Sequence, residues 1–150
     1  MAVFTFFYGA QAYEFERPEI IAKLGAKVDI VAKIYTLTIK GVSGMTFTVK
    51  QNDTVPALEA QLLDADGVGI NLEMSQVRFR AIERFGKKTI EKFATITDEL
   101  TGKVQIDWQA GDTDIAGYYN CEFEITFTDS TILTVPNDGY FMISIIEELG

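Results

Sequence analysis

The sequence contains no histidine, one cysteine and three prolines in 150 residues. Without histidine, the usual serine and cysteine triads cannot form, because each needs an imidazole base. Phosphate-binding loops and the GxGxxG motif are also missing. Cys121 has no partner for a disulfide within the chain, so we expect a buried, inert thiol in a protein made in a reducing cytoplasm. We therefore expect neither enzymatic activity nor a cofactor or metal.

Long apolar runs and an excess of basic residues are missing too. No stretch of 18 apolar residues occurs, so the sequence predicts no transmembrane helix. The first residues, MAVFTFFYGAQA, lack the positively charged leader of a secretory signal. The chain has 22 acidic and 13 basic residues and a formal net charge of -9. Such a field repels nucleic-acid phosphates. Neither a membrane nor a nucleic acid is an expected partner.

What the sequence does contain is a series of short segments in which apolar and polar residues alternate. From Met45 onward they recur between turns rich in Gly, Asp, Asn and Pro, and residues 90–97 read as one of these strands. No long helical pattern interrupts the series, and 150 residues fit one domain with an appendage. The pattern predicts an all-β protein, an antiparallel β-sandwich of the immunoglobulin-like type.

The stretch 108–127, WQAGDTDIAGYYNCEFEITF, joins a polar turn to a strand of strict alternation. A tyrosine two residues before an inward cysteine resembles the tyrosine corner of immunoglobulin-like sandwiches. For the tryptophan that opens the stretch, a ligand-stacking platform is the alternative to a core position. The predicted structural core consists of Trp108, Tyr119, Cys121, Phe123, Ile125 and Phe127.

Acidic turns and a basic strand each have two interpretations. The turn aspartates either bind Ca²⁺ or stabilise the turns through local hydrogen bonds, and the EF-hand spacing is absent. The basic residues of 78–88 either meet an acidic partner or form cross-strand pairs, with Arg78 and Arg80 near Glu122 and Glu124. The aspartates concerned are Asp64, Asp66, Asp112, Asp114 and Asp138.

Residues 1–44 differ from the rest and are interpreted as an N-terminal arm, followed by the sandwich over 45–150. Residues 3–8 predict a strand, residues 18–33 fit either a short helix or a strand, and residues 35–39 alternate like a strand. Because an apolar segment outside a core needs a surface to cover it, we expect the arm to anchor the protein to partner subunits. The partner-interface residues predicted here are Val3, Phe4, Phe6, Phe7, Tyr8, Ile20 and Leu24.

Several segments resemble the N-terminal domain of phage upper baseplate proteins. The most specific is DWQAGDTDIAGYY at 107–119; FTVKQNDTVPAL at 47–58, which matches the opening of that domain, LLDADG, VRFR, FEITF at 123–127 and PNDGY complete the match. The similarity spans about residues 45–147. It implies an immunoglobulin-like domain attached to a larger assembly in a phage particle. The family's long C-terminal part, which holds receptor-binding proteins, has no counterpart here.

The resemblance and the composition together predict a non-enzymatic virion structural protein made in the host cytoplasm. It would dock on the tail or baseplate, or on the capsid as a decoration protein, in several copies or as a homo-oligomer. Its partners would be other virion proteins. The alternative is a carbohydrate-binding module that contacts the host surface. A third class, a glycoside-cleaving enzyme, would need two carboxylates at a suitable separation in a cleft.

Overall fold

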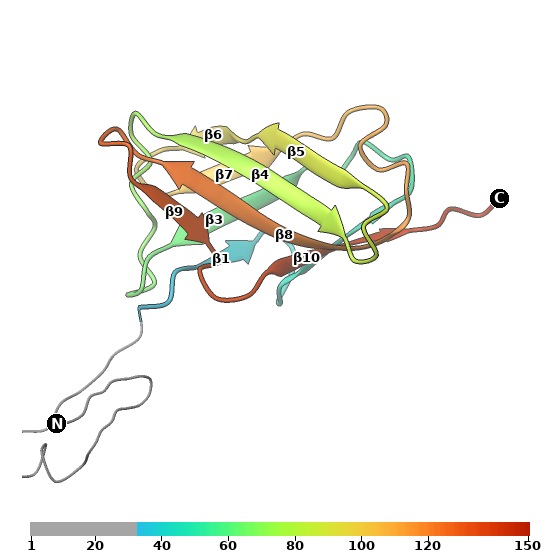
Figure 1. Cartoon of the computed structure of the whole chain (residues 1–150), viewed down its shortest axis with the longest axis horizontal. Helices are drawn as coiled ribbons and strands as arrows, with labels where there is room; N and C mark the ends of the chain where they lie inside the picture. Colours follow the sequence, from blue (N-terminus) through green and yellow to red (C-terminus); the bar gives the residue numbers. More distant parts are fainter. Residues whose placement is uncertain (1–32) are drawn as a thin grey trace, which may run out of the picture. The chain divides into compact units, whose positions relative to one another are not determined.

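The computed structural model describes residues 33–150, and this part of the chain contains ten β-strands and no helix (Figure 1). The all-β prediction is confirmed. The strands are β1 (Thr36–Ile39), β2 (Thr46–Lys50), β3 (Leu58–Leu63), β4 (Gln76–Glu83), β5 (Thr89–Phe93), β6 (Thr95–Asp98), β7 (Lys103–Ile106), β8 (Gly117–Thr126), β9 (Ile132–Val135) and β10 (Phe141–Ile146).

The strands form two sheets. One has four strands in the order β1-β3-β7-β6, and the other has six, in the order β2-β10-β8-β4-β5 with β9 paired to β8. Every pairing is antiparallel except β2 with β10, which is parallel. This order matches immunoglobulin sandwiches, in which one sheet holds the first strand and the opposite sheet holds the central and last strands. The protein is an immunoglobulin-like β-sandwich.

The sandwich begins earlier than the sequence suggested. β1 pairs with β3, and its inward side chains Leu37 and Ile39 are buried. Residues 33–150 form one compact unit. The glycine-containing segment 41–44 therefore connects a strand of one sheet to a strand of the other and does not separate the arm from the sandwich. Sequence spacing could not show this, because the partner of β1 lies some 20 residues along the chain.

The segment 90–97, read from the sequence as one strand, is in fact two. β5 pairs with β4 in the six-stranded sheet, whereas β6 pairs with β7 in the four-stranded sheet. Ala94 lies between them, and its N–H donates to the carbonyl of Val77 at 2.9 Å. The prediction of a single strand was wrong because a chain that crosses from one sheet to the other can keep its alternation.

The two sheets contribute different side chains to the core. The four-stranded sheet contributes aliphatic side chains, whereas the six-stranded sheet contributes aromatic rings among its aliphatic ones, and Trp108 comes from the segment after β7. The ring of Phe79 lies 5.5 Å from that of Phe123, 6.3 Å from that of Phe141 and 6.0 Å from that of Trp108. The buried aliphatic residues of the four-stranded sheet are Leu37, Ile39, Leu58, Ala60, Leu62, Val104 and Ile106.

Five of the six predicted core residues are buried, with Trp108, Tyr119, Cys121, Phe123 and Ile125 at most 4% exposed. Phe127 is only partly buried at the margin of this cluster. The reason is that β8 ends one residue earlier. Phe127 instead begins the turn to β9: its carbonyl accepts from Ser130 N and its own N–H donates to the carbonyl of Thr131.

The predicted strand at 3–8 and the open assignment of 18–32 fall on residues 1–32, outside the described part.

Candidate functional site

A buried tyrosine closes the corner before β8. The hydroxyl of Tyr119 donates to the backbone carbonyl of Ile115 at 2.7 Å. This is the hydrogen bond of a tyrosine corner, so the predicted feature is confirmed. Burial, followed by the nearby charge of Glu83, raises the pKa of Tyr119 to about 12. The phenol thus stays neutral and serves as a fixed brace for the corner.

The cysteine two residues later faces the core. Cys121 is fully buried, and burial raises the pKa of its thiol well above the ordinary range. Because the thiolate is the reactive form, a buried neutral thiol is inert. The predicted structural role of Cys121 is therefore confirmed.

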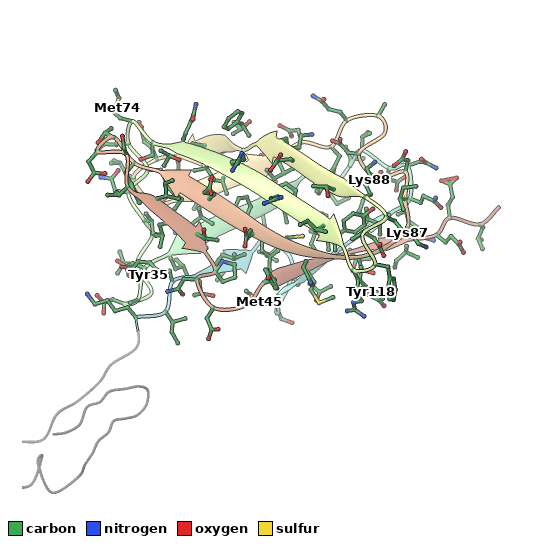
Figure 2. The ribbon with its side chains drawn as sticks, viewed as in Figure 1. Tyr35, Met45, Met74, Lys87, Lys88 and Tyr118 are labelled. Carbon is green, nitrogen blue, oxygen red and sulfur yellow. The ribbon has the colours of Figure 1, made fainter. Side chains whose placement is uncertain are left out.

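Two lysines of the β4–β5 hairpin hold the same corner from outside. Lys88 Nζ contacts the carboxylate of Asp114, and Lys92 Nζ contacts that of Asp112 at 2.5 Å. Lys92 also donates to the carbonyl of Asp107 at 2.7 Å. From the sequence, Lys88, which is labelled in Figure 2, belongs to the basic residues of 78–88 that could meet an acidic partner. Its ion pair within the chain could not be read from the sequence, because 26 residues separate the two groups.

The corner is also joined to the turn after β2. Asn52 N donates to the carbonyl of Thr113 at 3.0 Å, and the hydroxyl of Thr113 donates to the carbonyl of Asp53 at 2.8 Å. Gln51 Nε2 donates to the carbonyl of Asp114 at 2.8 Å. The most specific segment of the phage resemblance and the segment that opens it, about 60 residues apart, therefore form one hydrogen-bonded unit.

The acidic turns stabilise their own backbone. The carboxylate of Asp64 accepts from the N–H groups of Asp66 and Val68 at 2.9 and 3.0 Å. That of Asp112 accepts from Gln109 N at 2.8 Å. These contacts support the turn interpretation. Within residues 33–150, no group of three His, Cys, Asp or Glu side chains is placed to hold a metal ion.

The outer face of the six-stranded sheet has a charged half. Arg78 on β4 pairs with Glu124 on β8 at 2.8 Å, as the sequence predicted. Arg80 lies opposite Glu122 in register, yet its carboxylate partner is Glu91 on β5 at 3.4 Å. Glu91 was not predicted as this partner, because the pairing of β5 with β4, which places Glu91 opposite Arg80, could not be read from the sequence. The ion pairs of this half link three strands, β8, β4 and β5.

The other half of this face carries exposed aromatic and apolar side chains beside an arginine and an asparagine. We call it the tyrosine patch, and it consists of Ile82, Arg84, Tyr118, Asn120 and Tyr140. Tyr118 is 50% exposed and Tyr140 is 59% exposed. The guanidinium of Arg84 lies 5.1 Å from the ring centroid of Tyr118, a cation–π distance. Figure 2 shows Tyr118 at the end of the sheet where the β4–β5 hairpin turns.

The tyrosine patch borders a shallow depression of about 300 Å³. Four of the patch residues line it, Tyr118 being the exception, together with Arg80, Glu83 and Glu122. Glu83 is buried, and its carboxylate accepts the N–H groups of Phe85 and Lys87, so it stabilises the hairpin. The depression thus offers the exposed ring of Tyr140, an amide and charged groups on a sheet.

The outer face of the four-stranded sheet also has a depression, of about 280 Å³, but the outward side chains that line it are polar and none is aromatic. None of the large apolar side chains on β1, β3, β6 or β7 is exposed. Its ion pair, Lys40 with Glu59 at 3.2 Å, is open to solvent. The outward residues of this face are Thr36, Thr38, Glu59, Gln61, Leu63, Thr95, Thr97, Lys103 and Gln105, of which Leu63 is apolar and half-buried. The surface of the sandwich is therefore asymmetric.

The remaining predicted site residues are placed as follows. Trp108 is 4% exposed and its Nε1 donates to the carbonyl of Pro56 at 3.1 Å, so its ring is core and is not a platform for a ligand. The predicted arm interface lies wholly within residues 1–32 and outside the described part. The tyrosine patch was not predicted, although Tyr118 and Asn120 stood on the outward side of the alternation in the sequence.

Comparison with known proteins gives fold-level similarity alone. No family model matches the chain, and no curated protein matches it. Among solved structures, CopC from Methylosinus trichosporium OB3b is 13% identical, with a TM-score of 0.48, 77% of this chain covered and 97% of that one. Murine CRIg is also 13% identical, with a TM-score of 0.35 and coverages of 77% and 98%. Residues 33–150 include no helix that could cross a membrane.

Proposed function

We propose that this protein is a non-enzymatic structural component of a phage particle. The sandwich docks on a tail, baseplate or capsid protein through the outer face of its six-stranded sheet, and the N-terminal arm adds a second contact. The phage assignment rests on the resemblance of residues 45–147 to the upper baseplate N-terminal domain. Its most specific segment and its opening segment form the single hydrogen-bonded corner described above.

The observation that carries the docking role is the asymmetry of the two outer faces. Interface centres are enriched in Tyr, Trp, Phe, Met and Arg and depleted in Lys, Glu and Asp. The tyrosine patch has this composition, since exposed Tyr118 and Tyr140 lie with Ile82 and Arg84 on a rigid sheet. Apart from half-buried Leu63, the four-stranded face consists of Thr, Gln, Lys and Glu side chains. The face with the patch is therefore the one that binds a neighbouring subunit.

The test is incorporation into particles. A phage whose own gene is deleted is supplied with the protein or a variant, and the protein content of purified particles is measured by mass spectrometry. We expect Tyr118→Asp combined with Tyr140→Asp to lower incorporation at least tenfold, because two charges are placed in an apolar contact. Gln105→Asp on the four-stranded face is the matched control and should incorporate normally. Normal incorporation of the double variant contradicts the docking face.

The arm is tested in the same assay. Phe6→Asp combined with Phe7→Asp should lower incorporation while leaving the unfolding transition of the sandwich unchanged, because residues 33–150 form a compact unit of their own. Normal particle content for this variant would contradict an anchoring arm. A protein absent from purified particles altogether would contradict the virion role itself.

A carbohydrate-binding function is the second candidate. The observation that favours it is the depression beside the tyrosine patch, where the ring of Tyr140 lies with Asn120, Glu122 and Arg80. Aromatic faces with amide and charged groups are the usual lining of small-molecule sites. Binding of the purified protein on a glycan array, lost in Tyr140→Ala, would support this function. An array without signal, together with a stoichiometric place in particles, supports the structural role.

A further inference from the structure

One carboxylate on the outer face of the six-stranded sheet has no cation beside it. Arg78 pairs with Glu124 on β8 at 2.8 Å. Glu91 on β5 serves both arginines of β4, since its carboxylate lies 3.9 Å from Arg78 and 3.4 Å from Arg80. Glu122 forms no ion pair with any of the residues 33–150, although Arg80 lies opposite it in the register. Of the outward carboxylates on β4, β5 and β8, Glu122 alone is left unpaired within this part of the chain.

The arginine of the tyrosine patch does not compensate Glu122. Arg84 follows the end of β4, where its guanidinium covers the ring of Tyr118 at 5.1 Å from the centroid. Tyr118 and Glu122 are separated by about 13 Å along an extended strand. The side chain of Glu122 is half-buried. Its charge is therefore partly withdrawn from water without gaining an opposite charge.

An exposed aromatic ring lies next to this carboxylate. Extended by one residue, the register of β10 with β8 brings Tyr140 beside Glu122. Both residues line the depression of about 300 Å³, and Tyr140 is 59% exposed. Asn120 adds an amide to the same lining. A carboxylate and the face of a phenol ring both attract cations, so this end of the depression is suited to a positively charged group.

We propose that the depression receives an arginine side chain of the docking partner, which pairs with Glu122 and lies against the ring of Tyr140. The guanidinium is planar, fits a carboxylate with two hydrogen bonds and stacks on aromatic rings. Arginine is enriched at interface centres, whereas lysine is depleted there. The chain's net charge of -9 also favours a basic surface on the partner. The partner is thus a protein that presents an arginine at its contact surface.

This inference rests on the proposed docking role and names the group that the docking face recognises. A partner that covers the tyrosine patch displaces the water around Glu122. Burying a charge without an opposite charge destabilises a complex. Arg78 and Arg80 already contact carboxylates of their own sheet, so the cation that compensates Glu122 comes from the partner.

NMR titration of the purified full-length protein with small probes tests the site without a known partner. The probes are N-acetyl-arginine methylamide, its uncharged isostere N-acetyl-citrulline methylamide, and N-acetyl-aspartate methylamide. We expect the arginine probe to shift the amide signals of Asn120, Glu122 and Tyr140. It should bind about fivefold more tightly than the citrulline probe, because only the arginine probe forms an ion pair with the carboxylate.

A matched pair of variants assigns the effect to one carboxylate. Glu122→Gln should remove the preference for the arginine probe and leave the urea unfolding midpoint unchanged, because no ion pair within residues 33–150 is lost. Glu124→Gln should keep the preference, since Glu124 is already paired with Arg78. Equal affinities of the natural chain for the arginine and citrulline probes, or tighter binding of the aspartate probe, would overturn the proposal.

The particle assay separates the arginine site from the docking role itself. Glu122→Lys should lower incorporation about tenfold, because it places like charges together in a desolvated contact. If Tyr118→Asp combined with Tyr140→Asp lowers incorporation while Glu122→Lys does not, the face docks without an arginine at this site. The inference is then wrong although the structural role stands. If both variants incorporate normally, the docking face is wrong as well.

Discussion

The two sheets of the sandwich are built differently, although each buries one face. The four-stranded sheet is aliphatic inside and carries Thr, Gln, Lys and Glu outside. The six-stranded sheet is aromatic inside and carries ion pairs and the tyrosine patch outside. The four-stranded sheet thus mainly closes the core, whereas the six-stranded sheet both builds the core and presents a surface suited to a partner.

The largest expected effect concerns the interior. Phe79→Ala should lower the free energy of unfolding by about 3–5 kcal/mol, since it leaves a cavity among aromatic rings that cannot close. Val104→Ala removes two methyl groups from the four-stranded sheet and should cost about 2 kcal/mol. Urea unfolding of both variants measures the difference. Equal costs would contradict the view that the aromatic cluster around Phe79 contributes more to the stability of the core than the aliphatic side chains of the four-stranded sheet.

A smaller effect depends on pH and is confined to the six-stranded sheet. Because the pKa of Tyr119 rises from 10.0 to about 12 on folding, the folded state keeps a proton that the unfolded state loses. This contribution to stability is constant below pH 10 and is lost between pH 10 and 12, by about 2–3 kcal/mol. The raised pKa of Cys121 makes the loss begin near pH 9.

Denaturant unfolding at several pH values checks this expectation. Cys121→Ala should lower stability at neutral pH, yet its stability should begin to fall only near pH 10, because the thiol no longer titrates in the unfolded chain. Stability of the natural chain that is unchanged from pH 8 to pH 12 would show that the tyrosine corner and the thiol do not hold their protons in the folded state.

The smallest effect concerns the ion pairs of the two outer faces. Glu124→Gln should lower the free energy of unfolding by up to about 1 kcal/mol, because it removes the partner of Arg78 from a network that includes Glu91. Glu59→Gln on the four-stranded face breaks an isolated exposed pair and should change stability by about 0.2 kcal/mol or less. Both differences should vanish in 1 M salt. A larger cost for Glu59→Gln would reverse the comparison.

Local pattern predicted the fold class and much of its centre. The alternation from Tyr119 to Ile125 and the turn before it were enough to predict the corner, the buried thiol and the position of β8 beside β4. Arg78 and Glu124 followed, since register fixes which outward residues meet. Each of these features depends on neighbours along one strand or on one predicted strand pair.

Features that depend on the path of the chain between the sheets could not be predicted. Nothing local marks Ala94 as the point where a strand leaves one sheet for the other, and β1 looked like part of the arm for the same reason. The ion pairs of Lys88 and Lys92 with the corner join residues that meet only after the sandwich closes. The tyrosine patch needed β4, β8 and the segment before β10 to be placed side by side.

Hydroxyl-radical footprinting of the protein in solution and in intact particles tests the central claim most directly. Tyr118 and Tyr140 are about half exposed and Met74, in the turn before β4, is 85% exposed, so all three should be oxidised in the free protein. In the particle, we predict that both tyrosines lose most of their reactivity while the threonine- and glutamine-bearing peptides of β1 and β7 keep theirs. Protection of the four-stranded face, with Tyr118 and Tyr140 as reactive as in solution, would contradict the account.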